Sequence, residues 1–484
     1  MPRTLVEVAV PVPLRRTFTY WVPDDLRPGL VPGSQVQVPF GRRNLTGFVV
    51  GFPRQAEPGI QLKAIAAVSE AELSLPPHIL SLCRWVADYY LARLGEVLRA
   101  ALPAGLGKRS PGEVPAASGV QPDLTLNPDQ AAALREVTRS LDAGRPDAFL
   151  LYGVTGSGKT EVYLRAARHA VDTGGKALVL IPEIALSPQM VGRFEARFGS
   201  RVALWHSALT PSKRRQVWAR TRRGEIDVLV GARSAIFAPL PDLKLLVVDE
   251  EHESSYKQNE NPRYHARDVA MVRAQAAGAV TLLGSATPSL ETLHNAKRGK
   301  YRLLELPSRV AGRNRSRVDL VPLPTREPGQ RAVSYILSDA LRDALNTVQS
   351  AGEQAILFLN RRGFYTVVQC EDCKESVGCG DCDIVLTWHA TSARLVCHYC
   401  GKTRPVPQQC PACGKPTLSV YRGVGTQRVE HELARLYPNA RILRLDTDST
   451  RRRGSLEEAL EAFRSGEADI LLGTQMVAKG LDFP

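Results

Sequence analysis

Residues 153–160 read GVTGSGKT, which fits the phosphate-binding pattern G-x-x-x-x-G-K-[ST]. The apolar run AFLLY before the motif predicts a buried strand, and EVYLRAARHAV after it predicts a helix. A plain glycine turn is the alternative, and the agreement of both flanks disfavours it. The motif therefore predicts an α/β domain that binds a nucleotide at the start of a helix.

The residue types of this motif match what a polyphosphate requires. The small residues Gly153, Gly156 and Gly158 let backbone N–H groups surround the anion at a helix N-terminus. Lys159 places a positive charge on the β- and γ-phosphates, and Thr160 can ligate Mg²⁺. Upstream, the glutamine of LNPDQ can read the edge of adenine through its amide, although alone it would be an ordinary helix start. The predicted nucleotide-binding residues are Gln130, Gly153, Val154, Thr155, Gly156, Ser157, Gly158, Lys159 and Thr160.

Residues 243–252, LKLLVVDEEH, predict the acidic half of the same site at the end of a buried strand. Asp249 would hold Mg²⁺ through water, and Glu250 would orient or deprotonate the attacking water. An acidic surface turn is the alternative, and the preceding apolar run disfavours it. Lys159, Asp249 and Glu250 are therefore the predicted catalytic residues.

From residue 124 onward, strands alternate with helices, which is typical of a parallel sheet covered by helices. The runs AFLLY, KALVLI, IDVLV, LKLLVVDE and AVTLLG are short enough for buried strands. GSATPS, residues 284–289, follows the last of these and suits a contact that senses the phosphate state, although alone this signal is weak. A second set of strands, QAILFL, ARILRL and ADILLGT, follows after residue 332.

The N-terminal part has a different pattern, in which VEVAVPV, FTYWV, SQVQVPF and TGFVVGF are separated by proline and glycine. Such short β-branched and aromatic stretches predict a small, mostly β unit. One helix, residues 80–98, is expected to close it, and the segment 103–123 has the proline and glycine of a linker. The helix residues expected to pack in the core are Leu82, Cys83, Trp85, Val86 and Tyr89.

The charge balance indicates a polyanionic partner. The chain has 63 Lys and Arg against 49 Asp and Glu, a formal net charge of +14, which favours nucleic acid or an anionic membrane surface. No apolar run approaches the roughly 18 residues that a membrane span needs, and MPRTLVEVAV lacks a signal-peptide pattern. We therefore expect a cytoplasmic protein that does not bind a membrane. In that reducing compartment clustered thiols are metal ligands rather than disulfides.

Eight of the nine cysteines lie within residues 370–413 as four C-x2-C pairs. A tetrahedral Zn²⁺ takes two such pairs, so the eight thiolates suit two closed, structural zinc sites. Spacing alone leaves open which pairs combine, and iron–sulfur clusters or redox-active thiols remain alternatives. The predicted metal ligands are Cys370, Cys373, Cys379, Cys382, Cys397, Cys400, Cys410 and Cys413.

A series of motifs follows one another along the chain: GVTGSGKT, IPEIALSPQ, GARSAIFAP, DEEHESSYKQ, RYHARDVA, GSATPSLETL, FLNRRGF, the cysteine pairs and GTQMVAKGLDFP. In this order they resemble the PriA family of bacterial replication-restart helicases, over nearly the whole chain. The resemblance implies a superfamily 2 helicase with two RecA-like lobes, ATP-driven 3′ to 5′ DNA unwinding, and recognition of abandoned replication forks. It also implies single-strand DNA-binding protein, primosome proteins and the replicative helicase or its loader as partners.

The stretch after DEEH resembles the family's aromatic-rich loop, which couples contact with single-stranded DNA to ATP hydrolysis. Aromatic rings can stack on any base and cationic side chains can follow phosphates, so such a loop need not be sequence-specific. A solvated loop with incidental aromatics is the alternative. The residues of this DNA-coupling loop are Tyr256, Lys257, Arg263, Tyr264 and His265.

For the cysteines, the resemblance implies a nested arrangement, with Cys370, Cys373, Cys410 and Cys413 on one zinc and Cys379, Cys382, Cys397 and Cys400 on the other. The nearby His389 and His398 are then expected to face solvent or lie beside the ligands. Arg361, Arg362 and Lys479 resemble motifs of the second lobe that face DNA or nucleotide.

The chain departs from the family pattern in several places. Thr19 stands where an acidic residue of the pocket for a DNA 3′ end is common, and only the linker 103–123 stands where many members carry a winged helix. The sequence stops at KGLDFP, before the arginine-bearing motif that completes the ATP site and before a C-terminal DNA-binding domain. We therefore expect a fragment that binds ATP and DNA yet hydrolyses ATP poorly.

The predicted fold is α/β, with two RecA-like P-loop lobes, the second incomplete, a small mostly β N-terminal DNA-binding domain and a zinc-binding insert. The predicted function is an ATP-dependent 3′ to 5′ DNA helicase of replication restart, monomeric, using ATP, Mg²⁺ and two structural Zn²⁺ ions. A fork-binding primosome scaffold with little ATPase activity is the alternative, whereas an RNA helicase or generic translocase would not explain the cysteines. The predicted domains are a 3′-DNA-binding-like domain (1–104), a linker (105–123), lobe 1 (124–331), the first part of lobe 2 (332–369), the zinc insert (370–413) and the rest of lobe 2 (414–484).

Overall fold

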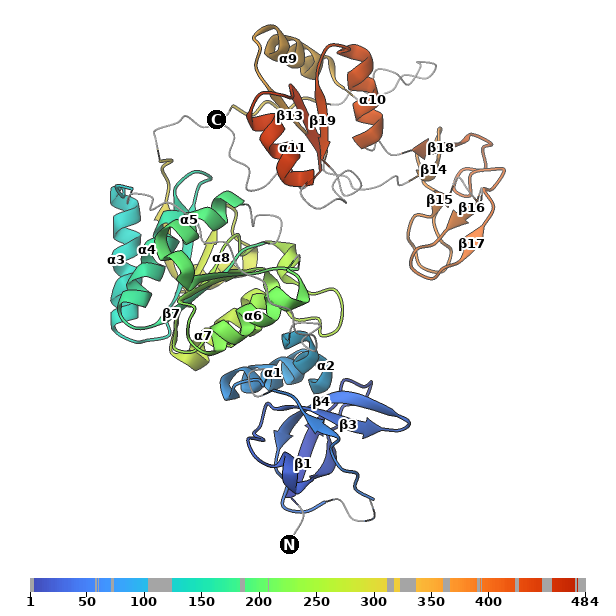
Figure 1. Ribbon diagram of the computed structural model, residues 1–484. Coiled ribbons are helices and arrows are strands. Elements are labelled where there is room, and N and C mark those ends of the chain that lie inside the picture. The colour runs from blue at the N-terminus through green and yellow to red at the C-terminus, as the bar shows by residue number, and fades with distance from the viewer. Residues whose placement is uncertain are drawn as a thin grey trace. The chain divides into compact units, whose positions relative to one another are not determined.

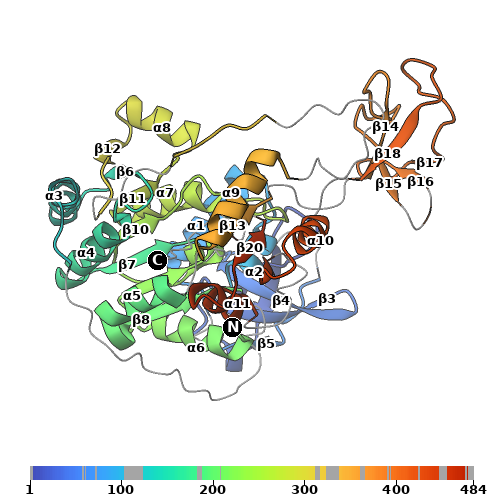
Figure 2. The same ribbon diagram turned by 90° about the horizontal axis from the view of Figure 1, so that it is seen from above.

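The computed structural model shows two compact units, residues 1–315 and 316–484 (Figures 1 and 2). The predicted linker 105–123 lies outside the described residues. The residues that the structure describes are 4–56, 59, 61–70, 74–102, 124–182, 188–207, 209–310, 317–322, 337–359, 366–389, 392, 394–422, 426–445, 455–474 and 477.

The N-terminal domain is a five-stranded antiparallel sheet in the order β2-β1-β4-β3-β5. Its core consists of alternate, β-branched residues such as Val6, Val8 and Val36, so the period-2 pattern accounts for these strands. Thr19 lies on β2 directly opposite Glu7 of β1. The strands are β1 (Thr4–Ala9), β2 (Phe18–Val22), β3 (Gln35–Phe40), β4 (Arg43–Gly51) and β5 (Ala67–Val68), and the 3-10 helix η1 (Asp24–Leu26) follows β2.

The single helix predicted over residues 80–98 is wrong, because two helices stand there: α1 (Pro77–Tyr89) and α2 (Leu94–Ala101). The chain turns at Leu91, whose φ of +51° lies in the left-handed region that a right-handed helix cannot contain. Apolar residues on both sides of this turn hid it from the sequence pattern.

The predicted apolar stripe of this region is only partly in the core. Leu82, Cys83 and Val86 are buried, as expected. Trp85 is half-buried, and Tyr89 is 64% exposed, because α1 ends there and the chain turns away. The prediction of core packing is therefore wrong for Tyr89.

The N-terminal domain and lobe 1 share one continuous hydrophobic core. Helices α1 and α2 lie between the N-terminal sheet and lobe 1 (Figure 1). There α1 packs on α7 (Ala266–Ala277) and α2 packs on the 3-10 helix η5 (Arg233–Phe237). Cys83 and Val97 belong to the same buried cluster as Phe237, Tyr264 and Val269 of the lobe. The two domains therefore form one body.

Lobe 1 contains a seven-stranded parallel sheet in the order β12-β6-β11-β10-β7-β9-β8. The runs predicted as strands form β6, β7, β9, β10 and β11, whereas β8 and β12 were not predicted. In this order β6, β11 and β10 are neighbours, so the loops that leave their carboxyl ends meet at one edge. The strands are β6 (Ala148–Gly153), β7 (Lys176–Leu180), β8 (Val202–Trp205), β9 (Val228–Gly231), β10 (Leu243–Val248), β11 (Val280–Ser285) and β12 (Arg302–Leu306).

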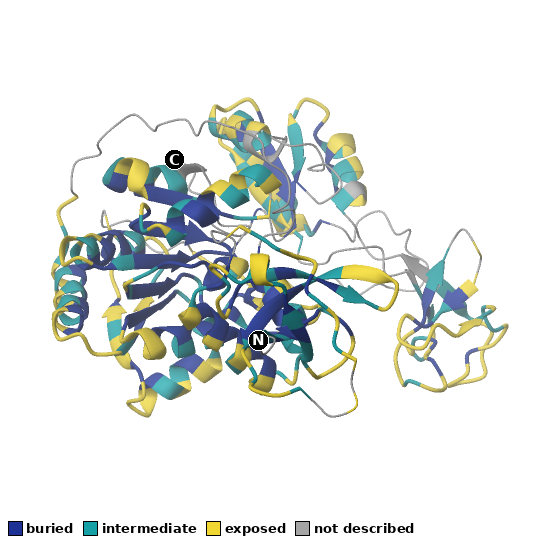
Figure 3. Ribbon diagram, turned by 60° about the horizontal axis from the view of Figure 1, so that its bottom comes forward, coloured by how far each residue is buried: buried dark blue, intermediate teal, exposed yellow. Residues whose placement is uncertain are grey.

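Helices cover both faces of this sheet, whose central strands are buried (Figure 3). Side chains of α3, α4 and α5 share a buried cluster with one face, and those of α6 and α7 with the other. The helices are α3 (Pro128–Asp142), α4 (Lys159–Asp172), α5 (Pro188–Phe198), α6 (Pro211–Arg222), α7 (Ala266–Ala277) and α8 (Leu290–Lys297), with 3-10 helices η4 (Gly199–Arg201), η5 (Arg233–Phe237) and η6 (Ser254–Tyr256).

The second unit holds a smaller parallel sheet in the order β13-β20-β19, formed by the three runs predicted after residue 332. Arg361, Arg362 and Lys479 lie outside the described residues. The elements are β13 (Ala355–Phe358), β19 (Ile442–Leu445), β20 (Ile470–Gly473), α9 (Asp339–Ser350), α10 (Thr426–Leu436) and α11 (Ser455–Arg464).

The cysteine-rich segment folds on a separate antiparallel sheet in the order β17-β16-β15-β14-β18. This sheet spans residues 366–422, so it extends beyond the predicted 370–413 at both ends, because β14 and β18 pair with each other outside the cysteines. The strands are β14 (Thr366–Cys370), β15 (Thr387–His389), β16 (Arg394–Val396), β17 (Thr403–Arg404) and β18 (Leu418–Arg422).

Candidate functional site

The glycine-rich loop joins β6 to α4 and has the backbone shape of an anion-binding turn. Gly156 and Gly158 both have a φ of +78°, and Gly158 is the residue that directly precedes α4. A Cβ atom at Gly158 would lie 2.2 Å from the Gln130 side-chain nitrogen, so a larger residue does not fit there. The first N–H groups of α4 have no partner within the helix and carry its positive dipole end, which suits a phosphate.

Two side chains of the loop are consistent with a phosphate ligand. Lys159 is 9% exposed and its Nζ donates to the Gly153 carbonyl at 3.0 Å, which leaves further N–H donors of the ammonium for a ligand. The Ser157 hydroxyl is buried and has no hydrogen-bond partner among the residues that the structure describes. A buried hydroxyl beside the loop is the kind of group that a bound phosphate satisfies.

Gln130 links the loop to the start of α3. Its side-chain oxygen accepts from the Asn127 N–H at 2.9 Å, which forms a capping box, and its amide nitrogen donates to the Ser157 carbonyl at 2.8 Å. The amide is therefore already engaged on both ends, and one lone pair and one N–H remain for a base. Recognition of adenine by Gln130 stays a prediction.

The acidic pair lies directly after β10. Asp249 is 6% exposed, and its Oδ1 accepts from the Tyr163 hydroxyl of α4 at 2.9 Å. Burial, followed by the charge of Glu250, raises the pKa of Asp249 to about 6, while the Tyr163 hydrogen bond and the charge of Lys159 act in the opposite direction. The Tyr163 hydrogen bond thus holds α4, the helix that begins with Lys159, against the acidic turn after β10. The shared role of Lys159 and Asp249 in catalysis stays a prediction.

Replacing Tyr163 with phenylalanine is expected to shift Mg²⁺-dependent nucleotide binding toward higher pH. Asp249 can hold Mg²⁺ only in its charged form. That form is present above the pKa of Asp249 and is lost as the pH falls through this pKa. Because the Tyr163 hydrogen bond lowers this pKa, its loss moves the midpoint further upward. Nucleotide affinity measured from about pH 5 to 8 tests this, with Tyr152→Phe, an exposed tyrosine of β6, as the control. Coinciding profiles for Tyr163→Phe and the unsubstituted chain would contradict it.

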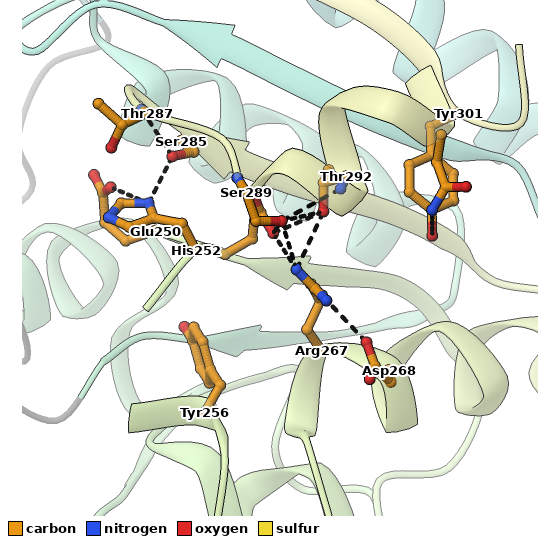
Figure 4. Close-up of polar contacts among 12 residues, drawn as sticks. Glu250, His252, Tyr256, Arg267, Asp268, Ser285, Thr287, Ser289, Thr292 and Tyr301 are labelled. Atoms are coloured by element: carbon orange, nitrogen blue, oxygen red, sulfur yellow. Dashed lines mark hydrogen bonds and ion pairs between the residues drawn. The ribbon is translucent and has the colours of Figure 1, made fainter. Parts of the chain in front are cut away.

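Glu250 lies in a strained turn next to the segment 284–289. Its φ is +44°, a left-handed conformation that glutamate adopts only when neighbouring contacts enforce it. His252 lies 3.6 Å from its carboxylate and contacts the Ser285 hydroxyl at 2.8 Å, and Ser285 Oγ also accepts from the Thr287 N–H at 3.0 Å (Figure 4). GSATPS therefore lies against the acidic turn, as a phosphate-sensing contact would require, and the sensing itself stays a prediction.

The predicted DNA-coupling loop has its two tyrosines in the core. Tyr256 is 1% exposed and its hydroxyl donates to the backbone carbonyls of Leu180 and Asp249, at 3.0 and 2.7 Å. Tyr264 is also 1% exposed and packs edge-on against Phe237. In this structure neither ring can stack on a base, so the stacking expected of them is not available.

The remaining loop residues are more accessible. Lys257 and Arg263 are exposed, and His265 is half-buried. Exposed cations can contact phosphates, and contact of this loop with DNA stays a prediction. The tyrosines instead fix the loop to the lobe.

The eight clustered cysteines form two four-thiol groups, Cys370/Cys373/Cys410/Cys413 and Cys379/Cys382/Cys397/Cys400, and this confirms the nested arrangement. Within each group the sulfur atoms lie within 4.8 Å of one another, with pairs as close as 3.6 and 3.8 Å. Zn–S bonds of about 2.3 Å in a tetrahedron place sulfurs about 3.8 Å apart. Both groups therefore fit a closed, structural zinc site.

The four C-x2-C pairs adopt the same turn. In each, the N–H of the residue after the second cysteine donates to the carbonyl of the first cysteine, as Gly401 does to Cys397 at 2.9 Å. That residue has a positive φ in every copy: Lys374, Asp383, Gly401 and Gly414. His389 and His398 face each other, with Nε2 atoms 3.2 Å apart, and belong to neither group.

Three family models match the chain. The PriA 3′ DNA-binding domain matches residues 7–103, the DEAD/DEAH box helicase domain residues 127–296, and the PriA DNA helicase Cys-rich region domain residues 379–405. The first covers most of the N-terminal domain with α1 and α2, and the other two fall within lobe 1 and the insert. Within the residues described above, no helix is both long and apolar enough to cross a membrane.

Curated relatives match over much of the chain. The replication restart protein PriA of Bacillus subtilis (strain 168) is 48% identical over 75% of this chain and 44% of its own length. That of Treponema pallidum (strain Nichols) is 40% identical over 99% of this chain and 72% of its own length. A solved structure of RecG bound to a three-way DNA junction matches 75% of this chain and 38% of that chain, at 18% identity and a TM-score of 0.42, too distant a likeness for a functional argument.

The match thus spans less than half of the Bacillus subtilis relative and most of the Treponema pallidum one. Identity at this level over almost the whole chain agrees with the three family models and with the paired cysteine groups. The chain belongs to the PriA family of replication restart proteins.

Proposed function

We propose that the protein is an ATP-dependent 3′ to 5′ DNA helicase that recognises stalled or abandoned replication forks and promotes reloading of the replicative helicase. The hydrogen bond from Tyr163 to Asp249 carries this proposal, because it holds the helix that begins with Lys159 against the acidic turn. The matched 3′ DNA-binding domain on the same body supports DNA as the substrate.

The chemistry follows from the positions of these side chains. Mg²⁺, when bound, would neutralise charge on the β- and γ-phosphates. Asp249, oriented by Tyr163, and the Thr160 hydroxyl would hold that ion, and Lys159 would stabilise negative charge on the transferred phosphoryl group. Glu250, partly exposed beside them, would orient the attacking water and accept its proton.

The substrate and partners proposed for this activity are those of the family. We propose that branched and single-stranded DNA bind through the N-terminal domain and the exposed cations near the ATP site. Single-strand DNA-binding protein, primosome proteins and the replicative helicase or its loader are the proposed protein partners of a cytoplasmic monomer. The net charge of +14 suits the polyanion.

A fork-binding primosome scaffold with little ATPase activity is a second candidate. It would need the DNA-binding domain and the zinc insert but not the acidic pair. The buried, hydrogen-bonded Asp249 and the loop lysine favour the motor, because a scaffold has no use for them.

Strand displacement from forked DNA tests the proposal. With ATP and Mg²⁺, the protein, whose ATP hydrolysis is expected to be slow, should still unwind a fork whose single-stranded tail ends in a 3′ terminus, and not the matched fork of opposite tail polarity. ATP hydrolysis should rise when the first fork is added. Fork binding without hydrolysis or displacement would support the scaffold instead.

A further inference from the structure

A third carboxylate, Glu251, follows the acidic pair and is fully buried at 0% exposure. Its side chain accepts four hydrogen bonds: from the Ser289 N–H at 2.7 Å, the Ser289 hydroxyl at 3.1 Å, the Thr292 hydroxyl at 2.8 Å and Arg267 Nη1 at 2.9 Å. A buried ion pair is seldom worth more to stability than apolar packing. Its presence beside the ATP site calls for a positional role.

Arg267 connects this carboxylate to the end of the DNA-coupling loop. It lies in the first turn of α7, two residues after His265. Besides Glu251, its Nη1 contacts the Ser289 hydroxyl at 2.7 Å, and its Nε contacts Asp268 at 3.2 Å. A shift of the loop end would therefore move the partner of Glu251.

The loop is tied to the acidic turn at its other end as well. Tyr256 donates to the Asp249 backbone carbonyl at 2.7 Å, and the Gln258 N–H donates to the Tyr264 carbonyl at 2.9 Å, which brings the two halves of the loop side by side. One end of the loop thus bonds to the residue before Glu250. The other end, through Arg267, bonds to the residue after it.

The same carboxylate also positions the segment 284–289. The Glu251 N–H donates to the Gly284 carbonyl at 3.1 Å, and its carboxylate receives the N–H of Ser289, the N-cap of α8. Glu250 lies between these attachments with a φ of +44°. Its orientation therefore depends on contacts made by its neighbours on both sides.

We propose that Glu251 and Arg267 are positioning residues. They couple the DNA-coupling loop to Glu250 and to the segment 284–289. This inference rests on the proposed ATP-driven function. Contact of the loop with single-stranded DNA shifts Arg267, which changes the hydrogen bonds of Glu251 and so the orientation of Glu250. By linkage, nucleotide binding and DNA binding strengthen each other through this pair.

The test measures that linkage by binding, independently of turnover. The affinity for a non-hydrolysable ATP analogue with Mg²⁺ is determined with and without single-stranded oligothymidylate. The unsubstituted protein is expected to bind the analogue roughly fivefold or more tightly with DNA. Glu251→Gln, which keeps the shape but removes the charge, is expected to reduce this ratio to about one.

Matched variants separate coupling from stability. Arg273→Met removes another buried arginine of α7, which donates to the Ile236 and Ala238 carbonyls and does not contact Glu251, so it should retain the coupling ratio. Arg267→Gln should reproduce the loss, including where Glu251→Gln does not fold. The double variant should lose no more than either single one.

The outcomes distinguish this inference from the proposed function. If the unsubstituted chain and Glu251→Gln showed the same coupling ratio, the inference would be overturned and the proposed function would be unaffected. A loss in Arg273→Met equal to that in Glu251→Gln would also overturn it, because both would then reflect a weakened helix. An unsubstituted chain that binds neither the analogue nor DNA would overturn the proposed function and the inference with it.

Discussion

Replacing Lys159 with alanine is expected to reduce DNA-stimulated ATP hydrolysis at least about 100-fold, the scale of losing one charged donor at a reacting phosphate. Lys159 stands at the start of α4 with its ammonium bonded to the Gly153 carbonyl, and in the proposed function it would stabilise the γ-phosphate. Alanine is compatible with the helix but leaves the negative charge that develops on the γ-phosphate uncompensated. Phosphate release with Mg²⁺, ATP and forked DNA measures the effect.

A second lysine of lobe 1 provides the control. Lys297 is exposed on α8, so Lys297→Ala should leave hydrolysis unchanged while altering the net charge equally. The Lys159→Ala protein should retain the thermal unfolding temperature and the fork affinity of the unsubstituted chain. Hydrolysis at an unchanged rate would remove the motor function, since no other described lysine lies in the glycine-rich loop.

Replacing Cys397 with serine is expected to lower the zinc content from about two ions per chain to about one and to unfold part of the insert. Cys397 is fully buried, and among the described residues of the insert the hydrophobic cluster has six buried members, two of which are themselves cysteines. Such a small core cannot offset the entropy of folding without metal. Metal analysis and limited proteolysis between residues 366 and 422 measure the two effects.

The ninth cysteine provides a matched comparison. Cys83 is fully buried in the shared core of the first unit and belongs to neither four-thiol group. Cys83→Ala should therefore keep both zinc ions. A Cys397→Ser protein that still bound two zinc ions, with an unchanged insert, would refute the structural role of this group.

The strands of lobe 1 were predictable where an uninterrupted apolar run forms a central strand. β8 and β12 are the two edges of the sheet, and they were missed for different reasons. β8 is a run of only four apolar residues, VALW, which is too short to identify a strand by its pattern, whereas β12 mixes charged with apolar residues. In β12, Arg302 and Leu303 are exposed and only Leu306 is fully buried. An edge strand is covered on fewer sides, so its sequence carries less of the pattern.

The positions of the glycine-rich loop and the acidic turn were predictable because both follow buried strands directly. The position of Tyr163 beside Asp249 was not, since a tyrosine at helical spacing reads as core and its partner is distant in the sequence. The roles of Tyr256 and Tyr264 were misjudged because aromatic residues serve equally well in a core and on a DNA-binding surface.

The buried contacts of Glu251 were predictable from the sequence, although the motifs above do not include them. A third carboxylate after a buried strand cannot stay unpaired, and RYHARD and PSLET supply an arginine and hydroxyls nearby in the chain. The pairing of the cysteines gave no such local signal. It depends on β14 and β18 joining the two ends of the insert, which only the three-dimensional fold settles.

The continuous core between the N-terminal sheet and lobe 1 has a geometric consequence for DNA handling. Because α1 and α2 are packed into both, the sheet cannot swing independently of the ATP-binding lobe. A DNA terminus held by the sheet would then stay at a constant offset from the bound nucleotide throughout the catalytic cycle. The first unit would thus fix the distance between the bound end of a DNA strand and the position at which lobe 1 contacts the DNA.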